Sequence, residues 1–213
     1  TEYVLDFSRP EVVAYIYGLM EKILSSGDIS YVKWDMNRYI TECYSAKKTE
    51  REQGKVFHQY ILGVYALYER LTKAFPEILF ESCSSGGARF DPGMLYYAPQ
   101  TWTSDDTDAM ERVRIQYGTS YVYPLSSMGA HVSEVPNQQT GRVTPLKTRA
   151  NAAMFGVFGY ELDLSQMTEM EKAEIKGQVQ FVKAHRHLIQ HGVFYRLLNP
   201  FEGREAGWIV VSE

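Results

Sequence analysis

The stretch Tyr31-Val32-Lys33-Trp34-Asp35-Met36-Asn37-Arg38 joins an apolar run to a set of polar side chains, and the rest of the chain is interpreted from it. The run from Ile29 to Trp34 predicts a short strand. Alternate side chains of a strand point to the same face, so Lys33, Asp35 and Asn37 are predicted to share one face. A buried strand that ends in such a face predicts a binding surface for a ligand rich in hydroxyl groups. A half-solvated antiparallel strand with a Lys33/Asp35 ion pair is the alternative that this stretch leaves open.

The composition indicates a globular domain and gives no sign of a surface for nucleic acid or membrane. The 213 residues are 45% apolar and 14% aromatic, which is enough to bury the core of one domain. The formal net charge is -4, with basic and acidic residues interspersed, so no basic stripe for nucleic-acid phosphates is expected. No apolar run reaches about 18 residues, so no membrane-spanning segment is expected either.

The two cysteines and the two chain ends bear on where the protein works. Cys43 and Cys83 have neither the spacing of a zinc site nor that of a disulfide framework. Unpaired thiols favour a reducing compartment, and we therefore expect a cytoplasmic protein. The chain opens at Thr1 without an initiator methionine and ends within the apolar pattern of residues 208–212, so we expect both ends to continue in a longer protein.

Strands and helices are predicted to alternate along most of the chain. Strand patterns occur at residues 3–7, 29–35, 78–82, 100–104, 122–132 and 158–163. Apolar residues at helical spacing lie between most of them, and Ser8-x-x-Glu11 and Thr168-x-x-Glu171 have the form of capping boxes. Such alternation predicts an α/β protein whose parallel sheet has helices outside it. Residues 193–198 and 207–212 predict two more strands without a helix between them.

The number of strand and helix units leaves two architectures open. A closed (β/α)8 TIM barrel needs eight units and usually about 250 residues, and this chain supplies fewer. The chain is then either an open doubly wound sheet or the later part of a barrel whose first strands lie outside it. No G-x-G-x-x-G follows the first predicted strand, which disfavours a dinucleotide-binding sheet.

Two aspartates, Asp35 and Asp105, directly follow predicted strands and are the candidates for chemistry. The carboxyl ends of parallel strands share one rim, so the two can converge, and two facing carboxylates are the minimum needed to cleave a glycosidic bond. Lys33 on the face of Asp35 favours the ionised form that a nucleophile needs. Asp106 and Asp108 beside Asp105 disfavour its ionisation, which suits a proton donor.

The neighbours of Asp105 have simpler interpretations of their own. Asp108 is interpreted as a helix cap, with Glu111 three residues further on, and Asp106 as a solvated or hydrogen-bonded support. A metal site in Asp105-Asp106-x-Asp108 is disfavoured because no glycine and distal glutamate complete a calcium loop. We therefore expect no metal.

The turn Ser84-Ser85-Gly86-Gly87 and a group of histidines are the remaining candidates. The turn lacks the Lys-Ser/Thr of a P-loop, and its glycines are instead predicted to let the main chain approach a sugar ring, with Cys83 beside it. The histidines do not share one helix face as zinc ligands would, so we interpret them as surface or interface residues. They are His185, His187 and His191.

Several blocks, taken in order, resemble glycoside hydrolase family 36, the bacterial α-galactosidases or melibiases. The blocks are VLDFSRP (4–10), KWDMNR (33–38), ESCSSGGARFD (81–91), WTSDDTD (102–108), GAHVS (129–133) and FGYELDL (158–164). Each block is short, but all of them in this order make a specific signal.

The resemblance implies a role for most of the candidate residues. Asp35 would be the nucleophile and Asp105 the acid/base of a retaining mechanism. Three positions match the family's galactose contacts: Lys33, Cys83 and Gly86. We add Asn37 as a further substrate contact, because it lies on the same strand face as Asp35.

The resemblance also implies a domain organisation and an activity. Residues 1–192 would be the later part of a (β/α)8 catalytic barrel, and residues 193–213 would begin a C-terminal β-sandwich domain. The implied reaction is hydrolysis of terminal α-linked galactose from oligosaccharides of the melibiose and raffinose type, without a cofactor. The full-length protein would be a homo-oligomer with no nucleic-acid or membrane partner. A transglycosylase of the raffinose-synthase-like type, or a fragment that binds sugar without turning it over, are the alternatives left open.

Overall fold

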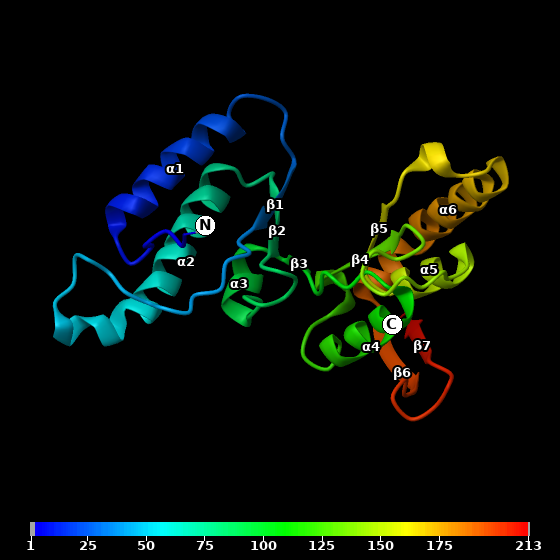
Figure 1. Cartoon of the computed structure of the whole chain (residues 1–213). Helices are drawn as coiled ribbons and strands as arrows, with labels where there is room; N and C mark the ends of the chain where they lie inside the picture. Colours follow the sequence, from blue (N-terminus) through cyan, green and yellow to red (C-terminus); the bar gives the residue numbers. More distant parts are fainter. Residues whose placement is uncertain (1–2, 213) are drawn as a thin grey trace. The chain divides into compact units, whose positions relative to one another are not determined.

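The computed structural model describes residues 3–212, which form two compact units that divide between Pro99 and Gln100 (Figure 1). Each unit combines parallel strands with helices that lie before, between and after them along the chain. The outermost residues of the two predicted domains, 1–2 and 213, lie outside the described residues.

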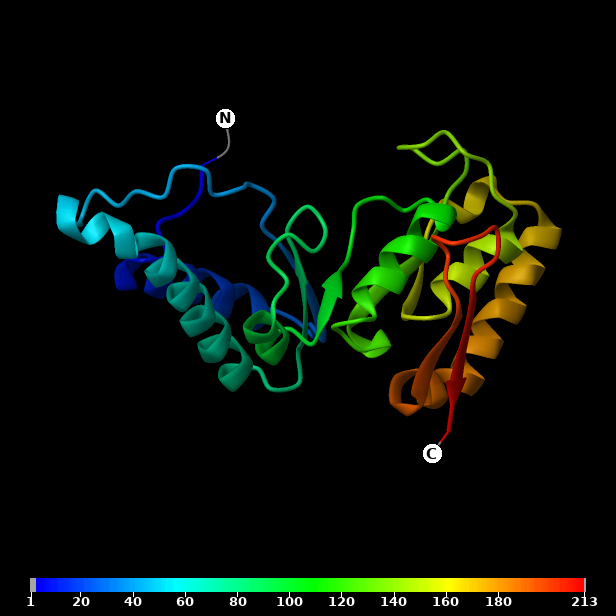
Figure 2. The same cartoon turned by 90° about the horizontal axis from the view of Figure 1, so that it is seen from below.

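The first unit contains two parallel strands, β1 (Tyr31–Asp35) and β2 (Leu79–Cys83), with Lys33 opposite Glu81 and Asp35 opposite Cys83. Its helices are α1 (Pro10–Leu24), α2 (Val56–Ala74) and α3 (Pro92–Tyr97), with a 3-10 helix at Glu50–Lys55. Figure 2 shows α1 and α2 side by side. Because β1 pairs in parallel, the antiparallel alternative for this stretch is wrong.

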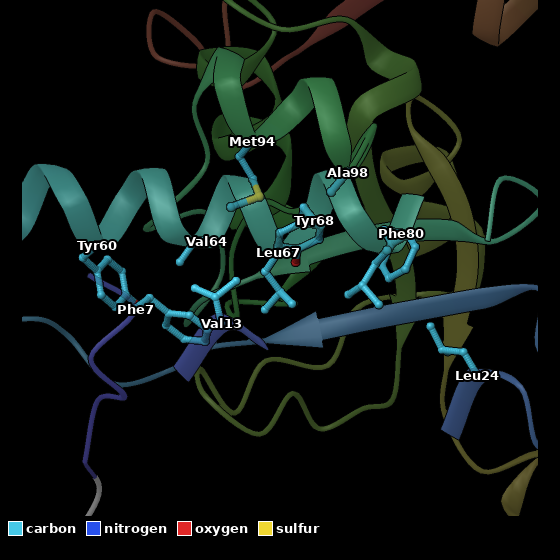
Figure 3. Packing of buried hydrophobic residues seen from close by; sticks show 11 residues of the cluster. Phe7, Val13, Leu24, Tyr60, Val64, Leu67, Tyr68, Phe80, Met94 and Ala98 are labelled. Carbon is cyan, nitrogen blue, oxygen red and sulfur yellow. The ribbon is translucent and has the colours of Figure 1, made fainter. Parts of the chain in front are cut away.

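One apolar core holds these strands against the helices. The ring of Tyr68, which is completely buried on α2, lies 5.2 Å from that of Trp34 on β1 and 5.8 Å from that of Phe80 on β2. Figure 3 shows Tyr68 with other buried side chains of the same core, among them Phe7, Val13, Tyr60, Val64, Leu67, Met94 and Ala98. The core thereby fixes the carboxyl ends of β1 and β2, where the candidate residues lie.

The second unit contains three parallel strands in the order β3-β4-β5. These strands are β3 (Gln100–Trp102), β4 (Met128–Ser133) and β5 (Val157–Glu161). Its helices are α4 (Ala109–Thr119), α5 (Leu146–Ala153) and α6 (Glu169–His191), with 3-10 turns at Leu125–Ser127 and Leu164–Gln166. Ala130 and Val132 of β4 pack against Leu146, Ala150 and Ala153, so the core of this unit lies between β4 and α5.

The two strands predicted at the end of the chain are confirmed as β6 (Val193–Leu198) and β7 (Gly207–Val211), and they pair as an antiparallel hairpin. The two strands run side by side in Figure 2, where they are orange and red. The rings of Phe194 and Trp208 pack 6.2 and 5.1 Å from that of Phe155, and Arg196 Nε donates a hydrogen bond of 2.8 Å to Ser120 Oγ. These contacts fix one face of the hairpin against the rest of the second unit.

The prediction of a strand at residues 3–7 is wrong, and so is the Ser8 capping box. The described residues of this segment have no strand pairing. The chain turns here because the Phe7 N–H donates to the Leu5 carbonyl and the Asp6 carboxylate accepts from the Ser8 N–H at 3.1 Å. The Ser8 hydroxyl also donates to Asp6, and α1 begins after Arg9 without a side-chain cap.

Two other strands are shorter than predicted, for local reasons. The strand expected at 122–132 is confined to β4, because the Ser127 N–H donates to the Pro124 carbonyl and closes a 3-10 turn. The strand expected at 100–104 ends at Trp102, because the Thr103 hydroxyl and the Ser104 carbonyl accept hydrogen bonds from Arg112. The capping box at the start of α6 is confirmed.

Candidate active site

Asp35 is the last residue of β1, and its side chain is exposed. Asn37 Nδ2 donates a hydrogen bond of 2.9 Å to Asp35 Oδ2, and Asn37 Oδ1 accepts one of 2.8 Å from the Ser85 N–H. The amide of Asn37 therefore links the carboxylate after β1 to the glycine turn after β2. The predicted proximity of Asp35 and Asn37 is confirmed.

Lys33 lies one strand repeat before Asp35 and forms an ion pair that the sequence did not indicate. Its Nζ lies 3.5 Å from Glu81 Oε1 on β2. Glu81 is buried, with a relative exposure of 5%, and its other carboxylate oxygen accepts a hydrogen bond from the Tyr31 hydroxyl. Burial, reinforced by this bond to Glu81, raises the pKa of Tyr31. The pairing thus fixes the lysine ammonium on the strand face that carries Asp35.

Cys83 ends β2 directly opposite Asp35 and is buried. Burial, with a smaller effect of the nearby Asp35 charge, raises the pKa of the Cys83 thiol to about 11. The thiol is therefore protonated at neutral pH, so Cys83 can donate a weak hydrogen bond but is a poor nucleophile.

The turn after β2 takes a backbone conformation that favours glycine. Gly86 has φ +78° and Ser85 has φ +48°, both in the left-handed region. The Gly86 carbonyl accepts a hydrogen bond of 2.8 Å from the Ser84 N–H, and the Ser84 hydroxyl donates to the Met36 carbonyl. The turn is thereby tied to the segment that follows β1, and Gly86 lies among the predicted sugar-contacting residues of the first unit.

Asp105 follows β3 in the second unit, and its side chain is exposed while the residues after it become buried. Asp106 Oδ1 accepts a hydrogen bond of 3.0 Å from the Asp108 N–H. Asp108 is 1% exposed and caps α4, accepting from the N–H groups of Met110 and Glu111. The predicted cap is confirmed, and Asp106 acts as a hydrogen-bonded support.

Several hydrogen bonds and one ion pair stabilise the Asp108 carboxylate. The Thr140 hydroxyl donates a hydrogen bond of 2.9 Å to this carboxylate, and Arg142 forms an ion pair with it. Burial by itself raises the pKa of Asp108, but the bonds from Thr140 and from two backbone N–H groups, together with the Arg142 charge, lower it overall. Asp108 is therefore ionised at neutral pH and serves the fold.

The first unit brings Lys33, Asp35, Asn37, Cys83 and Gly86 into one neighbourhood around the ends of β1 and β2. Asp105 belongs to the second unit, so the pairing of the two carboxylates stays a prediction.

The sequence interpretation gave no role to two buried groups of the candidate site: Glu81, paired with Lys33, and Arg112, bonded to the segment that carries Asp105. Only the register between β1 and β2 could have indicated the first.

The histidines of α6 are exposed, as predicted. The rings of His187 and His191 lie 4.7 Å apart, and that of His185 stacks on Phe181 at 4.2 Å. Within residues 3–212 there is no group of three or more His, Cys, Asp and Glu side chains that could hold a metal ion.

The chain is an α/β protein whose candidate site lies at the carboxyl ends of parallel strands, which is where barrel enzymes carry their active sites. A family model described as Melibiase matches residues 1–192, and the chain belongs to this family. No helix in the described part of the chain is long and apolar enough to cross a membrane.

Curated relatives match almost all of this chain. Alpha-galactosidase AgaA of Geobacillus stearothermophilus is 58% identical over 99% of the chain, and Alpha-galactosidase 1 of Pediococcus pentosaceus is 51% identical over 99%. The chain spans 29% of the length of each of these two relatives.

Solved structures give the same result for the fold. The crystal structure of the family 36 alpha-galactosidase AgaA matches all of this chain at 57% identity with a TM-score of 0.96, and the chain covers 30% of it. Variants of AgaA in complex with raffinose and with stachyose match with TM-scores of 0.97 and 0.96. The resemblance to glycoside hydrolase family 36 is confirmed, and the parallel α/β fold matches part of the TIM-barrel domain of these enzymes. The open doubly wound alternative is therefore set aside.

Proposed function

We propose that the full-length protein containing this chain is a retaining α-galactosidase acting on terminal α-linked galactose in oligosaccharides of the melibiose and raffinose type. The observation that carries the proposal is the likeness of the whole chain to alpha-galactosidases, including AgaA variants solved with raffinose and stachyose. The exposed Asp35 and Asp105 support it, since Asp35 ends the parallel strand β1 and Asp105 lies three residues after the parallel strand β3.

Two carboxyl groups are enough for a double displacement. An oxygen of Asp35 attacks the anomeric carbon as the bond to the leaving oxygen breaks, and Asp105 donates its proton to that oxygen. This step leaves galactose covalently bound to Asp35. Asp105, now a carboxylate, takes a proton from water, and the water oxygen attacks the anomeric carbon and releases Asp35. The mechanism expects the carboxyl groups to lie about 5–5.5 Å apart in the full-length enzyme.

The neighbours of Asp35 supply hydrogen bonds to the sugar in this proposal. The Lys33 ammonium and the Asn37 amide are held in place by Glu81 and by the Ser85 N–H, so they can donate to galactose hydroxyls without first being ordered. The protonated Cys83 thiol and the main chain at Gly86 would lie against the sugar ring. No step of the mechanism needs a cofactor.

The nucleophile can be tested in the full-length protein with an aryl α-galactoside. Asp35→Ala should abolish turnover, and azide should restore it by taking the place of the missing carboxylate and forming a galactosyl azide. Asp28→Ala, an exposed aspartate away from the site, is the matched control and should behave like the wild type. Lack of azide rescue, together with inversion at the anomeric carbon seen by NMR, would overturn the proposed mechanism.

Two alternatives make different predictions in the same assays. A transglycosylase of the raffinose-synthase-like type would form galactosylated products in place of free galactose when sucrose is in excess. A protein that only binds sugar would show no hydrolysis in the full-length wild type. Release of free galactose at high sucrose supports the hydrolase.

We also propose that residues 1–192 belong to a (β/α)8 catalytic barrel and that residues 193–213 begin a C-terminal β-sandwich domain. The outer face of the hairpin supports this, since it is both apolar and exposed. Its residues are Val193, Tyr195, Ile209 and Val211, which are 39%, 51%, 44% and 43% exposed. A second sheet that follows in the full-length chain would cover this face. Limited proteolysis of the full-length protein should then find the hairpin protected.

A homo-oligomeric state and a cytoplasmic location complete the proposal. Both cysteines are free, which suits a reducing compartment. Sedimentation of the full-length protein tests the oligomer, since a monomer would contradict it. Cell fractionation tests the location.

A further inference from the structure

Arg112 lies in the first turns of α4 and is almost completely buried, with a relative exposure of 3%. A buried guanidinium is costly unless its N–H groups find acceptors. Those of Arg112 donate to the Thr103 hydroxyl at 2.6 Å and to three carbonyl oxygens. These carbonyls belong to Ser104, Asp106 and Gly129, at 2.7, 2.8 and 3.0 Å.

Two of these carbonyls belong to the residues on either side of Asp105. One guanidinium therefore holds the main chain immediately before and immediately after the candidate acid/base residue. Only a planar group with several divergent donors can do so, which is a property of arginine and not of lysine. The bond to Gly129 also ties this segment to β4, so its position is set by the sheet.

Further contacts around Asp105 also hold the main chain of this segment in place. The Asp106 N–H donates a hydrogen bond of 3.1 Å to Ser104 Oγ. The main-chain N–H of Arg112 donates one of 2.8 Å to the Asp108 carbonyl in the first turn of α4. The guanidinium also lies 4.2 Å from the centre of the Trp102 ring, the last residue of β3. The main chain around Asp105 is thus held from several sides, while the Asp105 side chain itself is exposed.

We propose that Arg112 is a positioning residue for the acid/base carboxyl of Asp105, acting through the carbonyls of Ser104 and Asp106. The proposal rests on the proposed α-galactosidase function. A displaced Asp105 would donate its proton poorly, whereas attack by Asp35 in the first unit would be unaffected. The loss should therefore depend on how much the leaving group needs a proton.

The test compares two substrates of the full-length enzyme, raffinose with its poor leaving group and a nitrophenyl α-galactoside with a good one. In Arg112→Lys we expect kcat/KM for raffinose to fall by about 10 to 100 times, and that for the aryl galactoside by less than about 3 times, since general acid catalysis contributes about 100 to 10,000 times. The alkaline limb of the pH profile for raffinose should shift as well. If Arg112 only stabilised the fold, its replacement would change neither the ratio of the two kcat/KM values nor the alkaline limb of the pH profile.

Two further variants keep the test decisive. Arg114→Lys changes an exposed arginine of the same helix that pairs with Glu111 at 3.5 Å, and it should leave kcat/KM unchanged for both substrates. Thr103→Val removes a single acceptor of the Arg112 guanidinium and keeps the residue's shape, so it answers the question if Arg112→Lys fails to fold. In this variant kcat/KM for raffinose should fall relative to kcat/KM for the aryl galactoside by about 3 to 10 times.

An equal loss on both substrates, or no loss, in the folded variant overturns the positioning role. A wild type that hydrolyses neither substrate instead overturns the proposed function, so the two failures are distinguishable.

Discussion

Asn37 and Asp35 are joined by a hydrogen bond of 2.9 Å from the amide nitrogen to the carboxylate, and the carbonyl oxygen of the same Asn37 amide accepts from the Ser85 N–H at 2.8 Å. The side chain therefore holds the candidate nucleophile and the glycine turn in one arrangement. Its two hydrogen-bonding groups are used in opposite directions, which fixes the orientation of the amide.

Asn37→Ala should lower kcat/KM for an aryl α-galactoside by about 10 to 100 times in the full-length enzyme, because the carboxylate loses a group that orients it. Steady-state kinetics measure the effect. Ser85→Ala is the control, since it removes only the hydroxyl that donates a hydrogen bond of 3.3 Å to the main-chain carbonyl of Asn37 and keeps the Ser85 N–H that the Asn37 side chain accepts from. Equal activity of the two variants would show that the Asn37 amide does not orient Asp35.

Glu81→Gln should raise KM for galactosides by about 10 times and change kcat less, because Lys33 loses the charge that holds it. Tyr31→Phe removes a hydrogen bond to the same carboxylate while leaving the ion pair in place, so its effect on KM should be smaller. The prediction fails if Tyr31→Phe raises KM as much as Glu81→Gln does.

Cys83 should resist alkylation in the folded protein. With a thiol pKa of about 11, only about 0.1% is thiolate at pH 8, and the side chain is buried. Mass spectrometry after iodoacetamide treatment should find Cys83 unmodified until the protein is unfolded. Rapid modification in the native state would contradict the raised pKa.

The same pKa predicts how stability depends on pH. The unfolded thiol releases its proton near pH 8.5 to 9, whereas the folded thiol keeps it to about 11. The contribution of Cys83 is therefore complete below pH 8.5 and is lost between about 9 and 11, by up to about 1.4 kcal/mol per pH unit. Urea unfolding at several pH values should show a shallower alkaline decline in Cys83→Ser, and parallel curves would refute the linkage.

Gly86→Ala should destabilise the protein by about 1 to 2 kcal/mol, because φ at this position is +78° and an added Cβ crowds the following carbonyl there. The displaced turn should also raise KM for galactosides. Gly54→Ala is a matched control, since a Cβ at that glycine would meet no atom within 4 Å. Urea denaturation measures the difference, and equal stability of the two variants would argue against strain at Gly86.

Much of the local structure followed from the sequence. The amphipathic spacing of α2, the Thr168 cap of α6 and the Asp108 cap of α4 depend on residues a few positions apart, so each is encoded in a short stretch. The same holds for Asp35 and Asn37, which lie two residues apart at the end of β1 and are joined by a hydrogen bond between their side chains. The prediction of a strand at 3–7 was wrong because its apolar and aromatic residues suit a strand, while the hydrogen bond from the Ser8 N–H to the Asp6 carboxylate turns the chain.

The pairings around these residues were decided only by the tertiary structure. Lys33 meets Glu81 because β1 and β2 pair in one particular register, and a shift by one residue would turn Glu81 to the other face. Arg112 reaches Gly129 because α4 packs beside β4. Spacing within a strand or helix specifies which side chains share a face. Which buried charge meets which partner depends on strand register and helix packing, and these bring together residues that no local pattern connects.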